Sequence, residues 1–77
     1  MEKAVLQQNI LEIVASERSV HTLHILDQIK KMTLITKTTF NQNAVTEALH
    51  ELQKKGLILH IEKIDTWKIT ETGREEI

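Results

Sequence analysis

The amino-acid sequence predicts a single small α+β domain in which helices come first and an antiparallel hairpin follows. Its 77 residues suffice for one domain, residues 1–77. Up to residue 54 the apolar residues recur at the spacing of a helix that is buried on one side. From residue 57 onward apolar and polar residues alternate, as they do in a half-buried strand.

The composition excludes several classes of protein. The chain has no cysteine, so it can form neither disulfides nor thiolate zinc sites. No apolar run approaches the ~20 residues of a membrane-spanning helix, and the first residues, MEKAVLQQN, lack the apolar segment of a signal peptide. We therefore expect a cytoplasmic protein.

The first helix is predicted from Glu2 to Glu17. Its core-facing stripe comprises Leu6, Ile10, Ile13 and Val14. A second stripe, well away from the first, comprises Ala4, Leu11 and Ala15. Two interpretations of this second stripe remain open. It packs against another element of the same domain, or it is the seam of a homodimer in which the small alanines allow close approach.

The second helix follows a polar break at residues 16–19. Val20 is expected to add a short strand beside the hairpin, and Thr22 to cap the helix. The helix is expected to end around residues 30–32 and to turn three residues inward: Leu23, Leu26 and Ile29.

The connection from Thr33 to Thr38 is predicted to be longer than the tight turn between two packed helices. It places Lys37, Thr38 and Thr39 just before the third helix, where hydroxyls, an ammonium group and free helix amides can hold a phosphate. A structural interpretation also stands, because Thr39 and Gln42 have the spacing of a capping box.

The third helix has the clearest pattern in the chain. Its inward stripe comprises Val45, Ala48, Leu49 and Leu52. Gly56 is expected to end it as a left-handed cap, with Lys54 and Lys55 at the negative end of the helix dipole. The opposite face then presents Asn43, Thr46, Glu47, His50 and Lys54. The alternative is an ordinary solvated face, beside which Glu51 and Lys55 form an i,i+4 ion pair.

The hairpin is predicted from two alternating runs, residues 57–62 and 67–70, which are separated by a polar break at residues 63–66. Lys63 lies near the expected tip and Lys68 on the outer face of the second strand. Trp67, the only tryptophan, shares a strand face with Ile69 and is expected to plug the core beneath the hairpin.

These residues resemble a known family. The run Val45-x-x-Ala48-Leu49-x-x-Leu52-x-x-x-Gly56-Leu57-Ile58, followed by Trp67-Lys68-Ile69-Thr70-Glu71-x-Gly73-Arg74, is similar to bacterial and archaeal winged-helix regulators. The PadR-like group is the most similar and MarR-like repressors come next; the lengthened turn is a further PadR-like trait. The resemblance covers nearly the whole chain. It implies a winged helix-turn-helix of three helices and a two- to three-stranded antiparallel wing, which binds DNA and regulates transcription.

The charge pattern agrees with that expectation. The net charge is −1, but residues 28–70 hold seven lysines against four acidic residues and so carry +3, while the two flanking segments each carry −2. The partner predicted from this pattern is double-stranded DNA. Base edges would meet Asn43, Thr46, Glu47 and His50, and phosphates would meet Lys37, Thr38, Thr39, Lys54, Lys63 and Lys68.

Other functions remain as alternatives. The near-neutral charge and Glu47 would suit a winged-helix module that binds another protein. The spacing from Gly56 to Trp67 is also similar to that of Z-alpha domains, although Thr46 and His50 stand where that family has an asparagine and a tyrosine. His21 and His24 form at most a weak metal pattern. The chain shows no phosphate loop and no nucleophile–base pattern, so neither a cofactor nor an enzymatic activity is expected.

Overall fold

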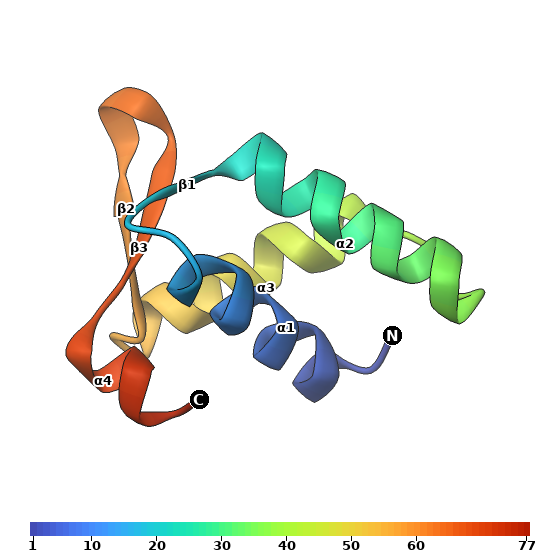
Figure 1. Ribbon diagram of the computed structural model, residues 1–77, viewed down its shortest axis with the longest axis horizontal. Helices are drawn as coiled ribbons and strands as arrows, with labels where there is room; N and C mark the ends of the chain where they lie inside the picture. Colours follow the sequence, from blue (N-terminus) through green and yellow to red (C-terminus); the bar gives the residue numbers. More distant parts are fainter.

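The computed structural model describes residues 1–77 and confirms the α+β class, with four α-helices and a three-stranded antiparallel sheet (Figure 1). The elements in chain order are α1 (Lys3–Ala15), β1 (Val20–His21), α2 (Thr22–Thr36), α3 (Gln42–Lys54), β2 (Ile58–Ile61), the 3-10 turn η1 (Glu62–Ile64), β3 (Thr66–Ile69) and α4 (Glu71–Glu75). None of these helices has both the length and the apolar character needed to cross a lipid bilayer.

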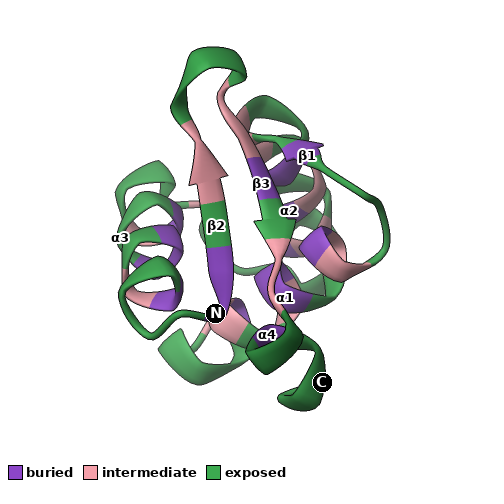
Figure 2. Cartoon of the chain, turned by 90° about the vertical axis from the view of Figure 1, so that its left-hand side faces the viewer, coloured by how far each residue is buried: buried purple, intermediate pink, exposed green.

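One hydrophobic core holds these elements together. Helix α1 packs against α2, α3 and β3, and it therefore forms the centre of the domain. The buried apolar residues form a single cluster. In Figure 2 the buried positions of α3 lie on the side turned toward the sheet, and its outer side is exposed. One core and one set of layers are what a chain of this length can build.

The second stripe of α1 packs within its own domain. Leu11 is only 4% exposed and belongs to the core cluster, whereas Ala4 is exposed and Ala15 is half-buried. A seam between two copies through Leu11 is therefore ruled out, because its side chain is already covered by the same chain. The first interpretation of this stripe is the correct one for Leu11.

Helix α2 differs from its prediction at its start, whereas Ile29 is buried and Leu26 is partly buried, as predicted. Its N-cap is His21, whose Nδ1 accepts a hydrogen bond from the amide of Leu23 at 3.1 Å, and Thr22 is the first helical residue. Leu23 is 68% exposed instead of buried. The buried side of α2 comprises Ile25, Ile29 and Thr33, with Leu26 partly buried beside them.

Helix α2 also runs further than predicted. It ends at Thr36, and Lys37 caps it in the left-handed conformation at φ 56°. Most of the connection expected from residues 33 to 38 is thus helical, although β-branched residues favour helices weakly. Packing of Met32 and Thr33 against the core outweighs that preference.

The connection between α2 and α3 consists of residues 37–41. Asn41, not Thr39, caps α3, and its Oδ1 accepts a hydrogen bond from the amide of Ala44 at 3.2 Å. The predicted capping box of Thr39 and Gln42 is therefore wrong. Asparagine is among the most effective N-cap residues, so Asn41 stabilises the start of α3 at least as well as the predicted cap at Thr39 would.

The prediction for α3 is confirmed. All four members of its inward stripe are buried, and Gly56 follows the helix at φ 79°. The amide of Gly56 donates to the carbonyl of Gln53 at 2.9 Å, and the amide of Leu57 donates to that of Leu52 at 3.0 Å. This pair of bonds is the Schellman motif, which commonly ends helices at a glycine.

The sheet has the order β1-β3-β2, and the strand predicted at Val20 is confirmed. Val20 pairs with Trp67, and His60 pairs with Trp67 from the other side. Trp67 is buried, as predicted.

The short helix α4, which the alternating pattern did not predict, closes the end of the domain near the start of β2. Thr70 caps α4 by accepting from the amide of Gly73 at 3.0 Å. A Cβ at Gly73 would lie 2.0 Å from the carbonyl oxygen of Leu57, so only glycine allows this approach.

The core predicts the effect of shortening one buried side chain of α3. Leu49→Ala removes a fully buried side chain and leaves a cavity beside α1, so the free energy of unfolding should fall by about 2–5 kcal/mol. Urea or thermal unfolding followed by circular dichroism measures this loss. Gln53→Ala, an exposed change on the same helix, should leave stability within about 0.5 kcal/mol of the parent. Equal stability of the two variants would contradict the core described above.

Candidate functional site

The outer face of α3 is an exposed surface rich in hydrogen-bonding groups. It comprises Asn43, Thr46, Glu47, His50 and Lys54, all of which are exposed. Thr46 Oγ1 donates to the carbonyl of Gln42 at 3.1 Å, so its methyl group and its lone pairs remain for a partner. No other side-chain hydrogen bond and no ion pair holds this face. The side chains that the sequence predicted to face bases thus lie together and are free to contact a partner.

One side of this face borders α1, and the sequence did not predict the contact there. Glu51 forms an ion pair with Nζ of Lys3 at 2.8 Å and accepts a further hydrogen bond from Gln7. The predicted i,i+4 pair between Glu51 and Lys55 is therefore wrong, because the carboxylate reaches across to α1 instead. No local spacing could have revealed this pair, since Lys3 lies 48 positions earlier in the chain.

The environment of Lys3 includes Glu47 as well as Glu51. The hydrogen bond from Lys3 lowers the pKa of Glu51, and that same bond raises the pKa of Lys3. The negative charge of Glu47 adds to the rise in the pKa of Lys3, which means that this ammonium lies within electrostatic range of Glu47. Lys3 of α1 is thus a cation near Glu47, the acidic residue in the middle of the α3 face.

The hairpin of β2, η1 and β3 projects beyond the helices (Figure 1). Lys63 lies exposed in the turn η1, and Lys68 lies exposed on the outer face of the sheet, paired across the strands with Leu59. Ile64, next to Lys63, is 58% exposed. Both lysines predicted for the hairpin therefore point to solvent.

A hydrogen-bonded network fixes the base of this hairpin turn to the start of α2. Asp65 Oδ1 accepts from the hydroxyl of Thr22 at 2.6 Å and pairs with Nε2 of His60 at 2.8 Å. Trp67 Nε1 donates to the same Thr22 oxygen at 2.8 Å. The rings of His60 and Trp67 are stacked, with centroids 4.1 Å apart. We call these four residues, Thr22, His60, Asp65 and Trp67, the hairpin latch.

Asp65 is the charged member of the hairpin latch. The hydroxyl of Thr22 and then the imidazole of His60 hold the pKa of Asp65 below its ordinary value. Its backbone adopts the left-handed conformation at φ 50°, which aspartate tolerates better than most residues. Its carbonyl oxygen also accepts from the amide of Thr22 at 3.0 Å. The turn is therefore held by side chain and backbone together.

The remaining predicted phosphate contacts lie at the other end of the molecule. Lys37, Thr38 and Thr39 are exposed in the connection after α2, whose C-terminal end points away from the hairpin (Figure 1). The hydroxyls of Thr36 and Thr38 lie 2.9 Å apart and hydrogen-bond to each other. The structure thus divides the predicted phosphate residues into the hairpin lysines, Lys54 at the end of α3, and this connection.

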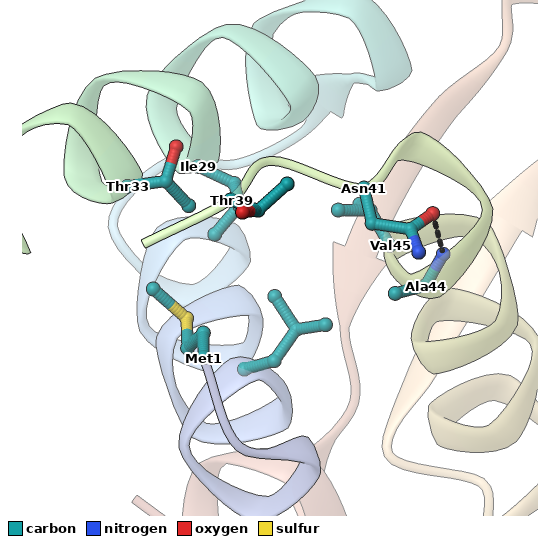
Figure 3. Close-up of a pocket in the computed structure, with 8 residues that line it drawn as sticks. Met1, Ile29, Thr33, Thr39, Asn41, Ala44 and Val45 are labelled. Atoms are coloured by element: carbon teal, nitrogen blue, oxygen red, sulfur yellow. Dashed lines mark hydrogen bonds between the residues drawn. The ribbon is translucent and has the colours of Figure 1, made fainter. Parts of the chain in front are cut away.

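A small cavity lies beneath the start of α3, between α1 and α2 (Figure 3). Its volume is about 40 Å³, and its lining includes Met1, Ile29, Thr33 and Val45. Small-molecule sites usually measure ~300–1,000 Å³, so this cavity suits a few water molecules at most. In Figure 3 the capping bond from Ala44 to Asn41 closes one side of it.

Comparisons with protein-family models, with curated proteins and with solved structures found no match to this chain. A functional interpretation therefore depends on the chemistry of its two exposed features, the α3 face and the hairpin. The α3 face offers hydrogen-bond donors and acceptors, and the hairpin offers one lysine in its turn and one on β3.

The hairpin latch predicts a dependence of stability on pH. Because the pKa of Asp65 is depressed in the folded state, its stabilisation is fully present above the unfolded-state pKa of about 3.9 and is lost as the pH falls through the folded-state value. Asp65→Asn should therefore cost about 1 kcal/mol near neutral pH, and the difference from the parent should shrink in acid. Urea unfolding at a series of pH values measures this difference.

Glu62→Gln is the matched control for the hairpin latch. Glu62 is an exposed acidic residue of the same turn, and its side chain makes no hydrogen bond or ion pair. This variant should follow the parent at every pH. A difference between Asp65→Asn and the parent that persists unchanged into acid would show that the Asp65 carboxylate does not support the turn.

Proposed function

We propose that this chain is a small DNA-binding transcriptional regulator of the winged helix-turn-helix type. In this proposal α3 enters the major groove and the hairpin is the wing. The order of the elements, helix–strand–helix–helix–strand–strand, supports it. The residues of α3 and the hairpin that resemble PadR-like and MarR-like regulators support it as well.

The observation that carries the proposal is the division of α3 into two faces. Four of its five apolar residues are buried, while a face of polar side chains lies free along a helix of 13 residues. An α-helix with its side chains is ~10–12 Å wide and the major groove is ~12 Å wide, so such a face fits the groove. Within it Asn43 is suited to adenine, because its amide can donate and accept on the same base edge.

The hairpin supports the proposal through its charge and its rigidity. Lys63 in the turn and Lys68 in β3 are free cations on a hairpin that the hairpin latch fixes to α2, so little backbone ordering entropy would be lost when they bind phosphates. In the proposed complex the wing lies along the DNA backbone beside the groove that α3 occupies. Lys54, at the end of α3, would meet the phosphates that border the groove.

Glu47 gives the proposed interface its selectivity. A carboxylate repels phosphates, yet it can accept a hydrogen bond from the amino group of cytosine. Lys3 lines the same surface depression as Glu47, so its ammonium lies where it can partly offset that repulsion. We therefore assign Glu47 to base recognition, with Lys3 as the cation that makes its position tolerable near DNA.

A protein-binding module is the second candidate. The same Glu47 and the overall charge of −1 favour it, since a surface of mixed charge suits a protein partner as well as DNA. Its contact surface would be the same α3 face. The experiments below separate the two candidates.

The first experiment sorts residues by the kind of contact they make. Binding is measured by fluorescence anisotropy over a series of salt concentrations, with a preferred duplex selected from random sequences and with an unrelated duplex. Lys63→Ala and Lys68→Ala should weaken binding to both duplexes and lower the salt slope by about one per phosphate contact. Asn43→Ala and His50→Ala should cost about 1–3 kcal/mol on the preferred duplex and little on the other.

Arg74→Ala is the control for these variants, because Arg74 is an exposed cation on α4 and belongs to neither the α3 face nor the hairpin. It should leave both affinities unchanged. If the parent does not bind DNA even at low salt, the DNA proposal is wrong, and the α3 face becomes the candidate surface for a protein partner.

The second experiment isolates the role of Glu47. Replacing Glu47 by glutamine removes the charge and keeps the shape. If Glu47 reads cytosine, Glu47→Gln should relax the preference at one base pair, as selection from random duplexes would show. A uniform gain in affinity for every duplex would instead identify Glu47 as a residue that only repels phosphates, and would overturn its assignment to base recognition.

A further inference from the structure

The C-terminal end of α2 carries the most exposed large apolar side chains of the chain. Ile35 is 81% exposed and Leu34 is 74% exposed. Figure 1 shows this end of α2 extending past the other elements. Clustered apolar exposure on a rigid helix is unusual for a surface that meets only water, and it commonly marks a contact site.

A groove lies directly beside this end of the helix, between α2 and the start of α1. Its volume is about 450 Å³. Its apolar lining consists of Met1 and Val5 from the first segment and Met32 from α2, and Val5 is itself 47% exposed. Glu2 lies at the same groove and is the only residue with a charged side chain that lines it.

The projecting side chain and the groove occupy neighbouring positions of one surface. Ile35 follows Met32 by three residues, so the two are neighbours on the helix surface, with Met32 toward the groove and Ile35 outside it. A two-fold axis beside them would place Ile35 of each copy into the groove of the other. Such an arrangement uses the same patch twice, as isologous dimers do.

The same two-fold axis would also bring opposite charges of this surface together. Glu2 has no ion-pair partner within the chain. Lys31 lies one turn before Ile35 on the same face, and Lys37 lies two residues after it, with no ion-pair partner of its own. Lys31 pairs with Asp27 at 3.2 Å, but both side chains are more than half exposed, so this pair holds it weakly.

We propose that a second copy of this chain occupies the groove. Ile35 of one copy packs against Met1, Val5 and Met32 of the other, and Glu2 pairs with Lys31 or Lys37 of the partner. A second copy fits better than any other occupant because one patch supplies the apolar projection, the groove that receives it and both signs of charge. A domain of this size also gains from burying more apolar surface against a partner.

The dimer has a consequence for DNA, and this consequence alone rests on the proposed function. The end of α2 lies at one end of the longest axis of the molecule, which measures 32 Å (Figure 1). Two copies joined there would carry their α3 helices on either side of the two-fold axis. The pair would therefore present two α3 helices to DNA, one from each copy.

The test measures assembly without DNA, so that its failure and that of the proposed function are distinguishable. Sedimentation equilibrium of the parent chain at micromolar concentrations should show a monomer–dimer equilibrium. Ile35→Glu should raise the dissociation constant at least ~tenfold, because it places a charge in an apolar groove. Leu23→Glu is the matched control, since Leu23 is equally apolar and exposed but lies at the other end of α2. Circular dichroism should show both variants folded, as both positions face solvent.

A charge exchange tests the proposed pairing itself. Glu2→Lys should weaken the dimer, and so should Lys31→Glu combined with Lys37→Glu, whereas all three changes together should restore at least part of the parent affinity. A parent chain that remains monomeric at high micromolar concentration would overturn the proposal. So would a dimer that Leu23→Glu and Ile35→Glu weaken equally, or one that the exchanged charges fail to restore.

Discussion

The burial of Trp67 is the constraint on which the rest of the structure depends. An indole can be buried at low cost only if its N–H finds a partner, and Thr22 supplies that partner at 2.8 Å. This bond ties the middle of β3 to the first residue of α2. The same threonine donates to Asp65, which ends the turn of the hairpin and also pairs with His60. One buried ring therefore determines where α2 begins, how β1 meets β3, and how rigidly the hairpin is held.

The central position of α1 decides which surfaces remain for function. Because α1 fills the space between α2, α3 and the sheet, even its second apolar stripe is used inside the domain at Leu11. The polar face of α3 is left free, and Lys3 of α1 lies along one margin of it. The cation beside Glu47 is thus a product of helix packing. It bears directly on whether an acidic residue can lie near a polyanion.

The exposed features lie at two ends of one small body, and their chemistry differs. The hairpin end offers lysines on a turn held by hydrogen bonds, which suits a charged partner. The α2 end offers exposed isoleucine and leucine beside a groove, which suits an apolar one. In the functions we propose, the first end and the α3 face meet DNA while the second meets another copy of the chain. Lys37 and Thr38, which the sequence predicted to contact phosphates, belong in this arrangement to the α2 surface, and the α3 face and the hairpin remain free for DNA.

The sequence by itself determined the features that depend on local periodicity and backbone chemistry. The buried and exposed faces of α3, the left-handed Gly56, the hairpin and the buried Trp67 all follow from spacing and residue type. Only the tertiary structure decided the start and length of α2, the cap at Asn41, the partner of Glu51 and the hairpin latch. The reason is physical: the burial of Thr33 against the core carries α2 past its predicted end, and the bonds of Lys3 with Glu51 and of Thr22 with Asp65 join residues that only folding brings together.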